Sequence, residues 1–200
     1  MASERPATGP LRVLIAGGGI AAAELLLGLR RAAEERVSIE LLAPNRELVY
    51  RPLAVTEPFG FGHAQRFDLD RIAAEHGARR RAAVLADVDS EGHEAVTAAG
   101  HRISYDVLAV TIGARPREAV AGALTLGGEA AFSAYRTLLE QLAPGQQLVF
   151  AVPAGATWAL PLYELALMTS TWIAEHGLGE VALTIVTPEE APLEVFGRRA

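Results

Sequence analysis

The chain has 200 residues, half of them hydrophobic, and carries a formal net charge of −6. A chain of this length and composition can bury a sizeable core, so global disorder is excluded. The negative charge gives no support to a nucleic-acid partner or an anionic membrane surface. Because there is no cysteine, disulfides, a thiolate nucleophile and cysteine-ligated metals are also excluded. The five histidines have no metal-ligand spacing, so no metal site is expected.

Residues 1–10 are polar and contain two prolines, so we expect a disordered tail. No signal peptide precedes the first apolar run, which makes the cytoplasm the expected location. A strand is predicted over about Arg12 to Ala16, followed by three glycines and a helix over about Ile20 to Glu35.

The glycines of this first turn match a phosphate-binding pattern. Gly17, Gly19 and Ala22 fit G-x-G-x-x-(G/A), in which a pyrophosphate approaches backbone N–H groups at a helix N-terminus. Gly17 permits the tight turn, Gly19 lets the phosphates come close, and Ala22 lets the helix pack on its strand. From the pattern alone, a plain strand-to-helix turn that binds nothing is an open alternative.

Further elements follow in chain order. A strand over Val37 to Leu42 would complete a parallel βαβ unit, and residues 44–67, rich in proline and glycine, are predicted to be one long irregular and functional loop. The basic run Arg79 to Arg81 is interpreted as a solvated corner between a helix and a strand. Next come a helix over Asp68 to His76 and three short strands over Arg81 to Val88, His93 to Ala98 and Arg102 to Ser104.

The last third of the sequence predicts a return to the central sheet and a second βαβ unit. Tyr105 to Ile112 is almost entirely apolar and is expected to be a buried strand. The later elements are a helix over Phe132 to Leu142, a strand over Gln147 to Val152, a helix over Leu160 to His176 and a strand over Val181 to Thr187. One βαβ unit cannot cover both faces of its sheet, so the chain is expected to be unfinished.

Two motifs together resemble the two-dinucleotide-binding-domain flavoproteins, which are FAD-dependent pyridine nucleotide-disulfide oxidoreductases. The first is the GGGIAA run from Gly17, and the second is YDVLAVTIGARP from Tyr105 to Pro116, close to the family forms GGGxAG and YDxLxxATGAxP. Tyr50-Arg51-Pro52-Leu53 is similar to the sulfide:quinone oxidoreductase and type II NADH dehydrogenase branch. The resemblance covers roughly residues 12–197 but only the N-terminal half of a usual member.

This resemblance implies an α/β fold: a three-layer Rossmann-like FAD-binding domain over residues 11–145 with a small antiparallel insertion, then the start of a second Rossmann-like domain over residues 146–200. It places the pyrophosphate on the glycine turn, the isoalloxazine near Arg51 and Pro52, and the adenine near the backbone of Leu85. The residues expected to bind FAD are Gly17, Gly18, Gly19, Ile20, Ala21, Ala22, Arg51, Pro52, Leu85, Thr111, Gly113 and Ala114.

The sequence departs from the family at informative places. Ala43 stands where many members carry an acid for the ribose hydroxyls, and Ile112 replaces a threonine. The second βα turn has Gly155 as its single glycine within Val152 to Glu164, so NAD(P)H binding there should be weak or absent. The sulfide:quinone group works through redox cysteines, which this chain lacks.

Two functions therefore remain. One is an FAD-dependent oxidoreductase that passes electrons from a small-molecule donor to a quinone-like or small acceptor, with a peripheral membrane quinone as one option. The other is a non-catalytic or split flavoprotein half that needs a partner or serves as a binding module. A plain NAD-dependent dehydrogenase is a weaker third. Catalytic residues are not identified, since redox chemistry would belong to the cofactor.

An incomplete second domain also predicts exposed apolar surface, and with it self-association or a need for the missing half. The side chains expected to lack cover are Val149, Ala151, Leu165, Leu167 and Ile185.

Overall fold

The computed structural model describes residues 9–156 and 158–197, so the predicted tail lies almost entirely outside the described residues. The chain forms two compact units. The first contains Met1–Tyr50 and Gln65–Ala114, and the second contains Arg51–Ala64 and Arg115–Ala200. The sequence predicts a boundary at residue 145 between a cofactor-binding domain and a second domain. These two compact units do not test that boundary, which stays a prediction.

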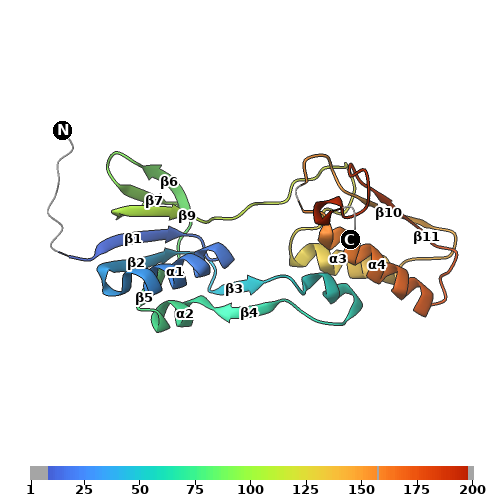
Figure 1. Cartoon of the computed structure of the whole chain (residues 1–200), viewed down its shortest axis with the longest axis horizontal. Helices are drawn as coiled ribbons and strands as arrows, with labels where there is room; N and C mark the ends of the chain where they lie inside the picture. Colours follow the sequence, from blue (N-terminus) through green and yellow to red (C-terminus); the bar gives the residue numbers. More distant parts are fainter. Residues whose placement is uncertain (1–8, 157, 198–200) are drawn as a thin grey trace. The chain divides into compact units, whose positions relative to one another are not determined.

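A four-stranded parallel sheet forms the centre of the first unit (Figure 1). Its strands, in spatial order, are β5 (Ala78–Arg81), β2 (Val37–Leu42), β1 (Leu11–Ala16) and β9 (Val107–Val110). The predicted βαβ unit is confirmed, because β1 and β2 pair in parallel from Leu11↔Val37 to Ala16↔Leu42. The expected solvated corner at Arg79 to Arg81 is wrong, since these residues form the edge strand β5 and pair with β2.

Strand β9 returns to this sheet as predicted, but it is not buried. Val107 is 44% exposed, Val110 55% and Ile112 67%. The reason is topological: β9 pairs with β1 on one side, and no strand among the described residues pairs with its other side.

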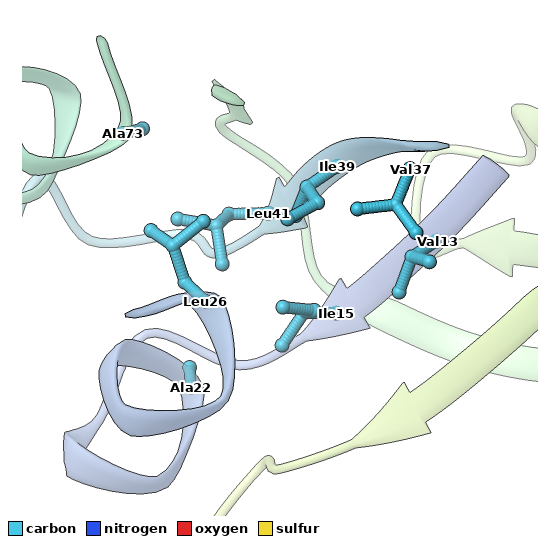
Figure 2. Close-up of a cluster of buried hydrophobic side chains, with 8 residues drawn as sticks. All are labelled: Val13, Ile15, Ala22, Leu26, Val37, Ile39, Leu41 and Ala73. Carbon is cyan, nitrogen blue, oxygen red and sulfur yellow. The ribbon is translucent and has the colours of Figure 1, made fainter. Parts of the chain in front are cut away.

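Helices cover one face of the sheet. Helix α1 (Ile20–Ala33) turns Ala22 and Leu26, both fully buried, toward β1 and β2, and a short 3-10 turn (Glu34–Arg36) follows it. Helix α2 (Leu69–Glu75) contributes Ala73 to the same core. Figure 2 shows side chains of β1 and β2, among them Ile15 and Leu41, gathered on the side of the strands that faces Leu26 of α1.

The opposite face is covered by a small antiparallel sheet. It contains β6 (Leu85–Asp89), β7 (Glu94–Thr97) and β8 (Arg102–Ser104), which confirms the predicted insertion. Ala95 and Ile103 pack from this sheet against Leu14 and Leu42. The three-layer arrangement predicted for a Rossmann-like FAD-binding fold is therefore present.

Residues 44–67 are not one irregular loop. They contain β3 (Glu47–Tyr50) and β4 (Gln65–Asp68), which pair antiparallel, and a 3-10 helix, η2 (Ala54–Phe59), between them. Pro52, Pro58 and two glycines break the chain only in the middle of this stretch, so its ends remain free to pair.

The second unit is built on the predicted later elements, with shifts at their ends. Strands β10 (Gln147–Ala151) and β11 (Ala182–Val186) pair in parallel, and a short 3-10 turn, η3 (Glu194–Phe196), closes the unit. Helix α3 (Glu129–Glu140) begins earlier than expected, and helix α4 (Leu160–Glu175) follows β10. The core brings Val55, Tyr135, Phe150 and Leu165 together.

The predicted exposure of apolar side chains in this unit is right for four of the five residues. Val149 is 54% exposed, Leu167 68% and Ile185 37%, and Ala151 is also exposed. Leu165 is wrong, because it lies on the inner side of α4 and is fully buried in the core. Among the described residues, no helix combines the length and hydrophobicity that crossing a membrane requires.

Candidate functional site

The turn between β1 and α1 is made of Gly17, Gly18 and Gly19. Gly17 has φ +140°, and its amide donates to the carbonyl of Leu42 at 2.9 Å. A Cβ at Gly17 would lie 2.2 Å from the carbonyl oxygen of Thr111. Only glycine satisfies both the backbone conformation and this close approach.

Gly19 is the N-cap of α1, and its surroundings are open. A Cβ built there meets no atom within 4 Å. No side chain caps the helix, and its first turn carries no acidic residue. Gly19, Ile20 and Ala21 are all exposed. The first N–H groups of α1 and the positive end of its dipole are thus accessible to an anion.

This turn also lies where the sheet reverses its order. From β1 the chain goes to β2 on one side, whereas β9 lies on the other. Thr111, just after β9, donates its amide to the carbonyl of Ala16 at 2.7 Å and its hydroxyl to the same oxygen at 3.0 Å. In open α/β sheets, ligands bind at the carboxyl ends of the strands at such a switch point. The fold thereby joins the two motifs that lie far apart in the sequence.

Most of the residues expected to bind FAD belong to the first unit. Ala22 is fully buried in the first turn of α1, and Gly113, with φ +73°, lies two residues after Thr111. Leu85 begins β6 and packs partly buried against the core beneath the antiparallel sheet. The exposed residue Ala114 ends the unit.

Arg51 and Pro52 are the exception, because they belong to the second unit. Both are exposed and precede η2, which packs on α3 through Val55 and through an edge-on contact of Phe59 with Tyr135. Their predicted role at the isoalloxazine stays a prediction.

Sequence reasoning did not find a group of charged residues behind the turn. Arg80 of β5 donates to both carboxylate oxygens of Asp70, at 2.7 and 3.0 Å, and to the carbonyl of Ala43 at 3.0 Å. The hydrogen bond from Arg80 holds the pKa of Asp70 below its usual range. Asp68 caps α2 by accepting from the amides of Asp70 and Arg71. No local signal marks the Asp70–Arg80 pair, since these two residues meet only when β5 joins the sheet.

A second arginine–aspartate pair closes the amino end of the same sheet. The Arg12 side chain and amide each donate to Asp106 at 2.8 Å, and the Asp106 amide donates to the carbonyl of Arg12 at 2.9 Å. These bonds lower the pKa of Asp106 to about 2. The aspartate of the second motif thus ties the start of β9 to β1, at the end opposite the glycine turn.

The turn between β10 and α4 has a single glycine, Gly155, although α4, like α1, has no side-chain cap and no acidic residue in its first turn. It runs over residues 152–159, of which 157 lies outside the described residues. Pro161 occupies the first turn of α4, and Trp158, 55% exposed, packs edge-on against Phe196. In the described part of the chain, no three acidic or histidine side chains are grouped as metal ligands.

Comparison with known proteins gives matches at the level of structure alone. No family model matches the chain, and no curated protein matches it. Among solved structures, sulfide:quinone oxidoreductase from Aquifex aeolicus has a TM-score of 0.74 at 18% identity, with 92% of this chain and 44% of that one covered. NDH2 from Plasmodium falciparum has a TM-score of 0.65 at 15% identity, covering 88% of this chain and 41% of that one.

Putidaredoxin reductase, solved in a covalent complex with putidaredoxin, matches at a TM-score of 0.63 and 16% identity, covering 89% of this chain and 50% of the other. This chain therefore spans half or less of the length of these structures. At such identities the matches show the fold, and they confirm the Rossmann-like fold predicted from the two motifs.

Proposed function

We propose that this chain binds FAD with its pyrophosphate on the glycine turn Gly17–Ala22 and forms the flavin-carrying part of an oxidoreductase. The observation that carries the proposal is an uncapped helix N-terminus with open space above Gly19 at the switch point of a parallel sheet. Oxidoreductases with the same fold, at low identity, support it.

The residues present fit the adenosine diphosphate part of the cofactor. Gly19 and the first amides of α1 would face the phosphates, and Leu85, Thr111, Gly113 and Ala114 would complete the site in the first unit. When bound, FAD supplies the redox chemistry, accepting and releasing electrons. With no cysteine in the chain, electron transfer would proceed without thiol chemistry, from a small-molecule donor to a quinone-like or small acceptor.

Recognition of the ribose would not use the carboxylate that commonly binds its hydroxyls at the end of the second strand. Ala43, at the end of β2, is fully buried and offers no carboxylate for the hydroxyls. The pyrophosphate would therefore contribute a larger share of the binding energy than in a site with that acid. This makes the turn the place to test the proposal.

The decisive experiment compares two valine substitutions in purified protein. Gly19→Val places a branched side chain above the turn, and Gly28→Val places the same side chain in α1, where a Cβ also meets nothing within 4 Å. We expect wild type and Gly28→Val to show the blue absorption band of bound flavin. Gly19→Val should lose at least about 100-fold in FAD affinity with an unchanged far-UV CD spectrum. Equal flavin retention in both variants would refute the placement.

A second candidate is a binding module without turnover that works with a second polypeptide. Exposed Val149, Leu167 and Val186 support self-association or pairing with a second polypeptide in either case. Bound FAD that is reduced by dithionite but by no nicotinamide or quinol donor would favour the module. Sedimentation of the same samples would report the association state.

A further inference from the structure

The glycine turn rests on a small apolar floor. A Cβ at Gly18 would lie 2.9 Å from the Cβ of Ala43 and 2.9 Å from the Cδ1 of Leu69. Ala43 is fully buried and Leu69 is 1% exposed. The height of the turn above the sheet is therefore set by where these two residues lie, since neither can move away into solvent.

Arg80 holds both parts of this floor. One arm of its guanidinium donates to the carbonyl of Ala43, and the other two donors bind the carboxylate of Asp70, the residue after Leu69. Its side chain is 10% exposed. The chain is also bonded here through its backbone, because the amide of Ala43 donates to the carbonyl of Arg81 at 3.1 Å.

The geometry of this contact suits arginine in particular. A planar guanidinium can hold a carboxylate with two parallel bonds and still present a donor to a carbonyl, whereas the lysine ammonium is a point charge without a fixed fork. The Asp70 side chain is 43% exposed, so the bond to the buried carbonyl of Ala43 and the two parallel bonds to the carboxylate, rather than shielding of the whole pair, keep the Arg80 guanidinium in one arrangement. Arg46 lies outside it, 69% exposed, and pairs with Asp68 and Asp70.

We infer that Arg80 is a positioning residue for the dinucleotide turn, acting through Ala43 and Leu69 with Asp70 as its partner. The inference rests on the proposed function for the identity of the ligand, but not for the effect on the turn itself. Removing the guanidinium loosens the end of β2 and the start of α2, which keep their backbone bonds and the Asp68 cap, so the support under Gly18 becomes less rigid. The first amides of α1 then meet the pyrophosphate in a wider range of positions, which lowers affinity.

The Arg12–Asp106 pair provides a matched control, because it joins strands of the same sheet at the opposite end. We would compare Arg80→Gln with Arg12→Gln. The FAD dissociation constant should rise about tenfold in Arg80→Gln and less than about twofold in Arg12→Gln, in line with outer-shell residues at other ligand sites. Asp70→Asn provides a second test of the same pair if Arg80→Gln does not fold.

Amide hydrogen exchange in the protein without ligand gives an independent readout. The amides of Gly17, Ala23 and Ala43 are hydrogen-bonded around the turn, whereas that of Asp106 is bonded at the other end. Arg80→Gln should speed exchange at the first three, and Arg12→Gln at Asp106. Uniform acceleration in Arg80→Gln, or an unchanged FAD affinity where wild type binds FAD, would overturn the inference. If wild type binds no FAD, the proposed function fails, and the exchange pattern alone decides the role of Arg80.

Discussion

Both units of this chain contain a parallel strand that leads into a helix, but the two turns present different backbones. Between β1 and α1 the chain uses Gly17–Gly19, and the helix begins with free N–H groups and no side chain above them. Between β10 and α4 it uses residues 152–159, and Pro161 removes one N–H group from the first helical turn. The first turn is therefore the better candidate for binding an anion, because it has three glycines and no proline in its first helical turn, although neither helix has a side-chain cap.

The largest difference between the two turns is expected when alanine replaces their glycines. Gly17→Ala forces a Cβ into the backbone of Thr111, whereas a Cβ at Gly155, with φ +84°, meets nothing within 4 Å. The first change should cost more than about 3 kcal/mol of unfolding free energy, because strain and overpacking add. Gly155→Ala should cost only about 1 kcal/mol for the left-handed conformation.

Urea unfolding can assign each loss to its unit. The sequence has two tryptophans, Trp158 and Trp172, and both belong to the second unit. Their fluorescence follows that unit, while far-UV CD follows both. A Gly17→Ala protein with unfolding free energy within 1 kcal/mol of wild type would contradict the tight contact with Thr111.

A smaller loss of unfolding free energy is expected from substitutions in the packing of the helix that follows the second turn. Helix α1 packs on β1 and β2 through the buried apolar side chains of Ala22 and Leu26, whereas α4 meets α3 through a buried hydrogen bond between the hydroxyls of Tyr135 and Thr169 at 2.7 Å. Thr169 donates to the carbonyl of Leu165, so Tyr135 is the donor to Thr169. Thr169→Val leaves the buried Tyr135 hydroxyl without this acceptor and should cost about 2 kcal/mol, against about 1 kcal/mol for Tyr135→Phe.

The pH dependence of the unfolding free energy gives a second test of the role of the Tyr135 hydroxyl. Burial raises the pKa of Tyr135 to about 12. A raised pKa means that the stabilisation is complete below about pH 10 and is lost as the pH rises through about 12. Tyr135→Phe should remove this loss in urea titrations followed by tryptophan fluorescence. An equal cost for the two substitutions at neutral pH would contradict the assignment of Tyr135 as the donor.

The elements that sequence patterns predicted well are those with a local physical cause. The β1–glycine–α1 segment, the βαβ pairing of β1 with β2 and the three-stranded insertion all follow from apolar runs bounded by glycine or proline. The second βαβ unit follows in the same way, with small shifts at its ends.

What the sequence did not predict depends on contacts between distant segments. Arg79 to Arg81 have no apolar pattern, and they form a strand because β2 offers an open edge for pairing. The bond of Arg80 to Asp70 exists only after that pairing. The exposure of β9 was missed for the same reason, since an apolar strand is buried only where a neighbour covers it.

The last prediction is that the second turn, unlike the first, binds no dinucleotide. Calorimetric titration with NADH and NADPH should give no saturable heat from the second turn up to about 1 mM, because that turn has one glycine and a proline where a pyrophosphate needs close approach to the backbone. FAD titrated under the same conditions serves as the positive control. Binding that Gly19→Val abolishes belongs to the first turn and leaves this prediction intact. A micromolar dissociation constant that Gly155→Val abolishes would place a nicotinamide site on the second turn, and the contrast between the two turns would then be one of shape rather than of function.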